Sequence, residues 1–121
     1  MTAALTVVRV EPLTISIDLE KQLRYLAIAG YPEEVCGVIH EHNIVHQYPN
    51  VFAGDRCLGF DMEIDIHDPT IKALWHSHPQ GLEQPSDDDF PCMKLLEEHG
   101  FHFHHIIVTP RRVIEYEVKT A

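Results

Sequence analysis

The 121-residue sequence lacks the features that define several classes of protein. No apolar run approaches the roughly 18 residues needed to cross a bilayer, so we expect no membrane partner. The first residues, MTAALTVVRVEPL, have neither the basic start nor the long apolar stretch of a secretory signal. No repeat, low-complexity tract or linker interrupts the chain. We therefore expect a cytoplasmic protein with a single domain over residues 1–121, of which residues 1–13 are an N-terminal extension.

Basic residues are scarce. The chain has 9 Lys and Arg against 19 Asp and Glu, which gives a formal charge of −10. Proteins that follow a phosphate backbone need the opposite sign, so we expect no nucleic-acid partner. Hydrophobic residues make up 45% and charged residues 23% of the chain, as in folded proteins and unlike disordered ones. The sequence carries no signal for an oligomeric state.

Cysteines are also few. The three, Cys36, Cys57 and Cys92, include no CxxC pair, and their odd number argues against a disulfide framework. We predict reduced and mostly buried thiols. Cys36 lies in the apolar run VCGVI, where a small buried side chain is favoured over a nucleophile.

Periodic apolar residues predict strands alternating with helices. In residues 17–30, Leu19, Leu23 and Leu26 fall on one face of a helix, and Gly30 is suited to end it. Alternating or continuous apolar runs predict the strands. The predicted strands are 5–10, 35–40, 44–48, 58–65, 71–76, 102–109 and 113–119.

A second helix is predicted after the irregular segment 79–85. Ser86 is suited to cap this helix, and Gly100 follows its expected end near His99. Pro91 falls five residues past the cap, so we expect a distortion there. With one helix on either side of the strands, the predicted fold class is α/β, with a central mixed β-sheet flanked by helices.

The segment WHSHPQGLEQPSDDD carries the strongest signal for chemistry. In an extended strand, His76 and His78 face the same way about 6.6 Å apart and can reach one ion, whereas Trp75 faces the core. Asp89 would stand in the first helical turn, where the helix dipole favours a carboxylate, and can supply a third ligand. Three protein ligands leave one position for water, as in catalytic zinc sites.

Each part of this segment also has a plain structural explanation. A single HxH pair can arise by chance in a chain with 10 histidines. Ser86 followed by three aspartates is also typical of a capped helix start. In that start Asp87 and Asp88 are expected to be solvated, with attraction of a cationic substrate as the alternative. The combined spacing is what favours a metal site.

HSH, then seven residues, then SxxD resembles the JAMM (MPN-plus) metallopeptidase motif, H-[ST]-H-x7-S-x2-D, without gap or substitution. That family also has an upstream glutamate in an E-x-C-G run. Glu34 in YPEEVCGVIH takes that position, whereas Glu33 does not. The resemblance runs from about Thr14 to the C-terminus. It implies a cytidine-deaminase-like JAMM/MPN sandwich.

The resemblance also implies roles for individual residues. His76, His78 and Asp89 would hold Zn²⁺ with one water, and Glu34 would be the general base. Ser86 would donate a hydrogen bond to the oxyanion. We expect it to cap its helix through its backbone position, because one hydroxyl proton cannot serve both roles well. The implied activity is hydrolysis of a peptide or isopeptide bond in a protein or peptide substrate.

Several stretches are more narrowly similar to the peptidase half of phage tail assembly proteins. They are YPEEVCGVI, HSHP, the PS-D helix start and IIVTP. This similarity implies a tail protein or cell-wall peptide as substrate, in the host cytoplasm if the protein is phage-encoded. Segment 66–71 is shorter than the helix that many relatives carry before the HSH strand.

Two other functions remain open. Bacterial relatives trim ubiquitin-like sulfur carriers, whereas the relatives that cleave ubiquitin isopeptide bonds hold ubiquitin with insertions that this length barely accommodates. Besides the processing of such carriers, the second open function is that of a non-catalytic MPN scaffold for assembly. Scaffold members typically lose metal ligands, and this chain keeps them all.

A second histidine cluster, HFHH, lies near the C-terminus. If residues 102–109 form a strand, His102 and His104 share a face and resemble the first pair. No carboxylate with suitable spacing completes the set, so we expect exposed or core-edge imidazoles there.

Overall fold

The computed structural model describes residues 4–121. Within this range the chain forms six β-strands and two α-helices, with a short 3₁₀ turn at Glu41–Asn43. The elements are β1 Leu5–Arg9, α1 Ile17–Gly30, β2 Cys36–His40, β3 Ile44–Tyr48, β4 Ile71–Ser77, α2 Asp89–Glu98, β5 His104–Val108 and β6 Val113–Thr120. The strands form one sheet in the order β1-β6-β5-β4-β2-β3. Because β4 and β5 run parallel and the other neighbours antiparallel, the predicted mixed sheet is confirmed.

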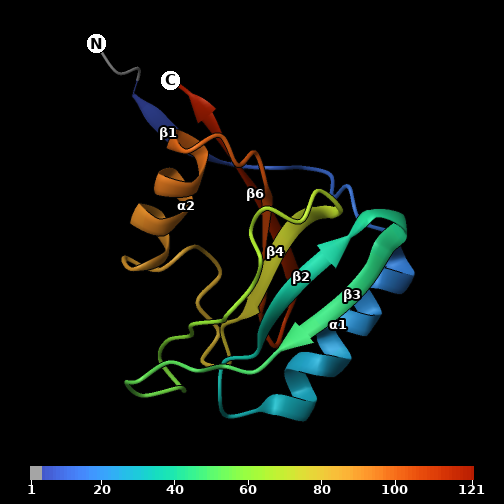
Figure 1. Cartoon of the computed structure of the whole chain (residues 1–121). Helices are drawn as coiled ribbons and strands as arrows, with labels where there is room; N and C mark the ends of the chain where they lie inside the picture. Colours follow the sequence, from blue (N-terminus) through green and yellow to red (C-terminus); the bar gives the residue numbers. More distant parts are fainter. Residues whose placement is uncertain (1–3) are drawn as a thin grey trace.

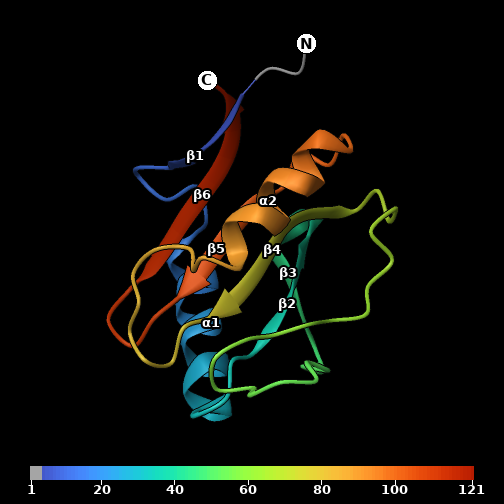
Figure 2. The ribbon, with the colours of Figure 1, turned by 90° about the vertical axis from the view of Figure 1, so that its left-hand side faces the viewer.

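The two helices cover opposite faces of the sheet (Figures 1 and 2). Adjacent residues of β5 show how the strand alternation divides the core between them. Ile106 packs with Leu19 and Leu23 of α1, whereas Ile107 packs with Met93 of α2. The α/β sandwich with a helix on either side is therefore confirmed.

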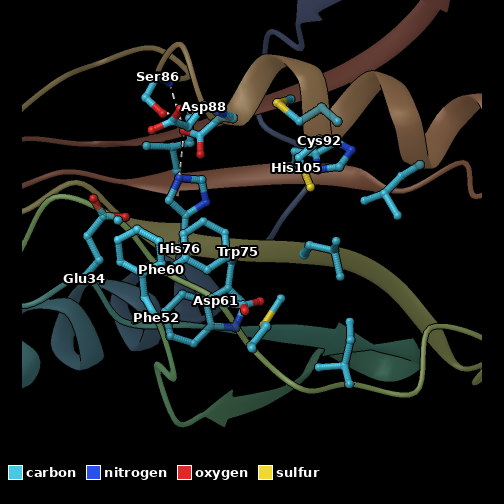
Figure 3. A pocket seen from close by; sticks show the side chains of 18 of the residues that line it. Glu34, Phe52, Phe60, Asp61, Trp75, His76, Ser86, Asp88, Cys92 and His105 are labelled. Carbon is cyan, nitrogen blue, oxygen red and sulfur yellow. Dashed lines mark hydrogen bonds and ion pairs between the residues drawn. The ribbon is translucent and has the colours of Figure 1, made fainter. Parts of the chain in front are cut away.

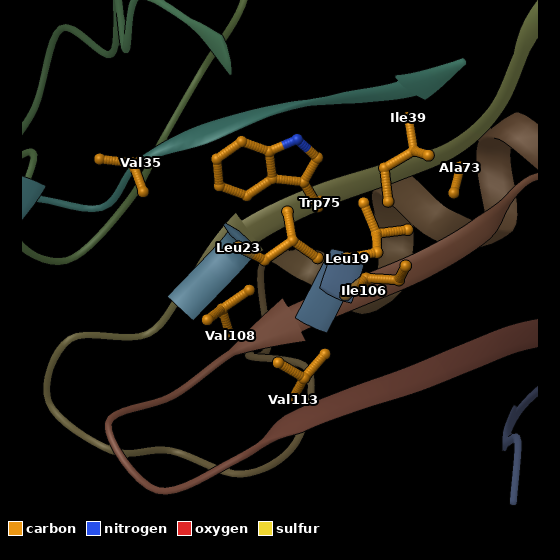
Figure 4. Packing of buried hydrophobic residues seen from close by; sticks show 9 residues of the cluster. All are labelled: Leu19, Leu23, Val35, Ile39, Ala73, Trp75, Ile106, Val108 and Val113. Carbon is orange, nitrogen blue, oxygen red and sulfur yellow. The ribbon is translucent and has the colours of Figure 1, made fainter. Parts of the chain in front are cut away.

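Helix α1 closes the largest of the three buried clusters. The Ser16 hydroxyl accepts a hydrogen bond from the backbone N–H of Leu19 at 3.2 Å, which caps the helix. Leu19 and Leu23 are buried, and Leu26 packs at the edge of the same cluster, as their spacing predicts. Figure 4 shows Leu19 and Leu23 against Trp75 and the neighbouring strands.

Trp75 fills the middle of this core and is fully buried. It points to the α1 face, as predicted, and leaves the opposite face of β4 to the histidines beside it. A glycine on the next strand makes room for the indole. A Cβ on Gly37 would stand 2.7 Å from the indole nitrogen and 2.0 Å from the His46 carbonyl oxygen.

Residues 58–65 do not form a strand, so that prediction is wrong. They belong to a long irregular connection between β3 and β4, which lies on the α2 side of the sheet (Figures 1 and 2). The predicted strand over 102–109 is shorter, because β5 begins at His104. The 5–9 part of the predicted N-terminal extension forms β1, which pairs with β6.

Helix α2 begins at Asp89 with Asp88 as its N-cap residue, two residues later than predicted, so the prediction of Ser86 as the N-cap is wrong. Pro91 is therefore in its first turn, where a backbone N–H would have no partner inside the helix, so the expected distortion is unnecessary. The prediction of mostly buried cysteines is correct for Cys36 alone, since Cys57 is half-buried and Cys92 is exposed on α2. None of the helices in the described part of the chain is long and apolar enough to cross a membrane.

A buried carboxylate ties the segment before α1 to the sheet. The Glu115 side chain of β6 is fully buried. It accepts hydrogen bonds from the Thr14 backbone N–H at 2.8 Å and from the Thr14 hydroxyl at 2.6 Å. The Nδ1 atom of His104 on β5 contacts the same carboxylate. One side chain of β6 thus joins β5 to the segment just before α1.

Candidate metal centre

The antiparallel pairing of β2 with β4 brings three polar side chains onto one face. Cys36 lies opposite His76 in the ladder, and the Ser77 N–H donates to the Val35 carbonyl at 2.8 Å. One step further, the same register sets Glu34 opposite His78. Directly opposite residues of an antiparallel pair share a face with Cβ atoms about 5 Å apart. The upstream glutamate and the two histidines are therefore neighbours because of strand register.

Three donor atoms converge on one point above this face. The Nε2 atoms of His76 and His78 lie 3.0 Å apart. The Oδ2 atom of Asp89 lies 3.1 Å from the first and 3.2 Å from the second. Asp89 is the first residue of α2, so the helix start sits over the end of β4 (Figure 3).

Ser86 and Asp89 form a reciprocal pair of hydrogen bonds at the start of α2. The Ser86 N–H donates to Asp89 Oδ2 at 2.9 Å, and the Asp89 N–H donates to Ser86 Oγ at 3.1 Å. The serine oxygen acts as an acceptor in this pair, so its own proton is not used. The expected conflict between capping and donation from the hydroxyl therefore does not arise.

The ring of His78 is fixed by a backbone carbonyl. Its Nδ1 atom lies 2.9 Å from the Leu82 oxygen, which can only accept, so Nδ1 carries the proton. In the neutral ring, Nε2 then presents a lone pair toward His76 and Asp89. Metal-binding histidines are commonly oriented in this way. The sequence gives no hint of this contact, because any residue type supplies a carbonyl.

Burial and pairing shift the pKa values of these groups in opposite directions. Burial lowers the pKa of His76 and keeps it neutral. Burial also acts to lower the pKa of His78, but the hydrogen bonds to Asp89 and the Leu82 carbonyl raise it overall. Burial would raise the pKa of Asp89, yet its contacts with the two imidazoles lower it well below the usual range. An ionised carboxylate in contact with two imidazoles is a suitable set of ligands for a divalent ion.

Glu34 stands beside this cluster and is also buried. One of its carboxylate oxygens and the two imidazole nitrogens lie within 4.8 Å of one another. Burial raises the pKa of Glu34 to about 7, the Asp89 carboxylate acts in the same direction, and His78 opposes them. A carboxyl group with a pKa near neutrality can both take and return a proton.

Two side chains absent from the sequence prediction position this region. Asn50 donates to the Glu34 carbonyl at 2.9 Å and to the Gly59 carbonyl at 3.1 Å. It therefore links the start of β2 to the long β3–β4 connection. From that connection, the Phe60 ring stacks on His76 with 4.3 Å between ring centroids. An isolated Asn or Phe in a loop carries no motif that could have identified these contacts.

The second histidine cluster does not pair as the strand prediction required. Because β5 begins at His104, His102 lies outside the strand and contacts Glu97 of α2. His104 turns to Glu115 and Glu117. Cys36, the alternative nucleophile, is fully buried, and burial raises the pKa of its thiol to about 12.

The donor set fits a zinc ion. Two imidazoles and one carboxylate are ligands of the kind found in open zinc sites. Ligands about 2.05 Å from a tetrahedral ion lie about 3.3 Å from one another. The separations of 3.0, 3.1 and 3.2 Å among the three donors are close to that value.

Comparison with known proteins gives one family. A family model described as prokaryotic homologs of the JAB domain matches residues 16–119. The matched range contains the histidine pair, Glu34, Ser86 and Asp89. No curated protein and no solved structure matches the chain.

Proposed function

We propose that this chain, which belongs to the family of prokaryotic homologs of the JAB domain, is a zinc-dependent metallopeptidase or isopeptidase. A single observation carries the proposal: Asp89 Oδ2 lies within 3.2 Å of both imidazole nitrogens, which are themselves 3.0 Å apart. His76, His78 and Asp89 would hold the ion. When bound, zinc supplies Lewis-acid activation of a water molecule, whose pKa it lowers to about 7.

Glu34 would act as the general base. Its carboxylate is near the histidine pair but farther from it than Asp89, which leaves room for a water molecule between them. Its raised pKa suits a group that takes a proton from the attacking water and returns it to the departing amine. The backbone anchor from Asn50 keeps this side chain at the start of β2.

Ser86 would stabilise the negative charge that develops on the scissile carbonyl oxygen. Its hydroxyl oxygen accepts from the Asp89 N–H, and its proton remains available to a substrate. Removing one such donor costs about 10²–10³ in kcat in other acyl-transfer enzymes. The two hydrogen bonds between Ser86 and Asp89 support this role, because they keep the serine beside the proposed zinc ligand and leave its hydroxyl proton free.

The substrate would be a protein or peptide with a peptide or isopeptide bond. The similarity of YPEEVCGVI and HSHP to phage tail peptidases favours a tail protein or cell-wall peptide. A ubiquitin-like sulfur carrier is the alternative substrate, and a cleavage assay on both kinds of substrate separates them.

Zinc content tests the metal part of the proposal. Protein purified without chelator is expected to contain about one zinc per chain, measured by inductively coupled plasma mass spectrometry. Asp89→Asn should lower this content strongly. Asp87→Asn, which makes the same change on an exposed neighbour, should leave it unaltered. Equal zinc in both variants would contradict the assigned ligand set.

Peptide cleavage tests the catalytic part. The zinc-loaded protein is incubated with a peptide library and with isopeptide-linked peptides, and the products are identified by mass spectrometry. Glu34→Gln should reduce cleavage by about 10²–10⁴, whereas Glu33→Gln, an exposed neighbour, should not. Zinc binding with no cleavage by wild type would instead support the scaffold alternative.

A further inference from the structure

A cavity of about 450 Å³ opens directly onto the candidate metal centre. Glu34, His76, Ser86 and Asp89 line one end of it. The other end extends beneath α2, between the helix, strands β4 and β5, and the β3–β4 connection (Figure 3). A volume of this size is in the range of pockets that bind small ligands, so it can hold a large amino-acid side chain.

The walls of the extended end are apolar. Three of them come from alternate positions of the β3–β4 connection, namely Met62, Ile64 and Ile66. Leu74 of β4 and Leu96 of α2 complete this part of the wall. All five pack against the buried cluster around Val38 and Phe103, which gives them a fixed support. Such walls favour a bulky side chain without charge.

Asp61 and Cys92 also line this cavity, and one imidazole lies among its apolar walls. His105 of β5 is 7% exposed and lines the cavity. No hydrogen bond joins its ring to any described residue. In Figure 3 the ring lies beneath α2, on the side of His76 away from Glu34. Among the described residues, the fully buried polar side-chain atoms without a partner are Trp75 Nε1 and Glu83 Oε1, so the His105 ring nitrogens remain accessible and a ligand can bond to them.

We propose that this cavity is a specificity pocket for a bulky, mainly apolar side chain with a hydrogen-bonding tip, for which tyrosine is the best match among the common residues. The side chain would belong to the residue next to the bond that is cut, since the cavity is continuous with the metal centre. The role rests on the proposed hydrolase function.

Tyrosine fits both features of the pocket. Its ring can lie between Leu96 and the connection, and its hydroxyl can reach the neutral His105 ring, which offers one donor and one acceptor. Phenylalanine would fill the same space but leave the imidazole without a partner. Sites built to bond a hydroxyl discriminate against analogues that lack it. Glycine and lysine would gain little from apolar walls.

Binding can be measured without any turnover. The zinc-loaded, ¹⁵N-labelled protein is titrated with N-acetyl-tyrosinamide, N-acetyl-phenylalaninamide, N-acetyl-lysinamide and N-acetyl-glycinamide and followed by NMR. We expect the tyrosine probe to bind at least about tenfold more tightly than the glycine probe, with shifts at Leu96, His105 and Ile107. Shifts confined to other surfaces, or equal affinity for all four probes, would overturn the pocket.

Matched variants then locate the site. Leu96→Trp should fill the cavity and weaken tyrosine binding about tenfold, whereas Leu95→Trp, on the exposed side of α2, should change it less than about twofold. His105→Phe should remove the preference for tyrosine over phenylalanine, and circular dichroism checks that it folds. A preference that persists in His105→Phe would refute the role of the imidazole.

Cleavage of a peptide library separates this inference from the proposed function. Enrichment of tyrosine beside the cut bond supports both. Cleavage without this enrichment leaves the hydrolase intact and overturns the pocket as a specificity site. Tyrosine binding in the cavity with no zinc-dependent cleavage of any peptide overturns the hydrolase and the substrate role, while the binding site itself remains.

Discussion

Replacing Glu115 by glutamine should destabilise the protein without touching the metal centre. The fully buried carboxylate accepts two hydrogen bonds from Thr14, at 2.8 and 2.6 Å, and contacts His104. Glutamine has nearly the same shape but only one acceptor oxygen. Its amide group must then face either the Thr14 hydroxyl, the Thr14 N–H or the imidazole. At least one charge-assisted hydrogen bond is lost in every arrangement.

The size of the effect follows from these contacts. A hydrogen bond to a charged group contributes about 1.5–3 kcal/mol, and a buried donor without a partner adds a cost of its own. We therefore expect Glu115→Gln to lower the free energy of unfolding by about 2–4 kcal/mol. For a chain of this length that corresponds to a decrease in Tm of roughly 8–15 °C.

The effect should also depend on pH. Burial acts to raise the pKa of Glu115, but the hydrogen bonds from Thr14 and His104 outweigh it and lower the pKa below the ordinary value of 4.5. The stabilisation by the carboxylate is therefore complete above about pH 4.5 and is lost as the pH falls through the lower folded-state pKa. Glutamine does not titrate. The difference in stability between wild type and variant should shrink in acid.

Thermal unfolding followed by circular dichroism between pH 3 and 8 measures both effects. Glu117→Gln is the matched control, because it makes the same change two residues along β6 on a partly exposed side chain. A surface ion pair contributes at most about 1 kcal/mol, so its Tm should change little. Equal losses in the two variants, or a Glu115→Gln deficit that stays constant down to pH 3, would refute the assigned anchor.

Three further predictions concern the metal centre. Because burial raises the pKa of Glu34 to about 7 and a bound cation opposes this, cleavage should increase with pH up to a midpoint at or below about 7, as measured by kcat/KM profiles. A midpoint well above 7 would contradict Glu34 as base. Ser86→Ala should lower kcat about 10²–10³-fold with zinc content unchanged, and a lower zinc content would instead assign the serine to metal binding. Asn50→Ala should lower the free energy of unfolding, measured in urea, by about 2–3 kcal/mol, because it removes the bridge between the Glu34 and Gly59 carbonyls. An unchanged free energy would show that the connection keeps its conformation without Asn50.

The positions of the candidate ligands were predictable because short-range rules place them. Strand alternation sends His76 and His78 to one face, and a helix start presents Asp89 over it. The position of Glu34 beside the histidines also depends on the register of β2 against β4, which cannot be read from the sequence. Glu34 was identified through the resemblance to a known motif. The contacts of Leu82, Asn50 and Phe60 depend on loop conformation, for which there was no comparable rule.

The failed strand prediction over 58–65 shows where a period of two misleads. The alternation is real: in residues 60–66 the even positions are half-buried and the odd ones exposed. Alternation, however, reports that one side of an extended segment is buried, and does not report that its backbone is paired. No strand of the described sheet pairs with this segment. The sheet ends at β3, the strand that precedes the connection. The apolar side of the segment instead faces the cavity beneath α2, where Met62, Ile64 and Ile66 form the wall. The pattern that suggested a strand therefore forms one side of the pocket, and the substrate preference proposed for this protein depends on that same alternation.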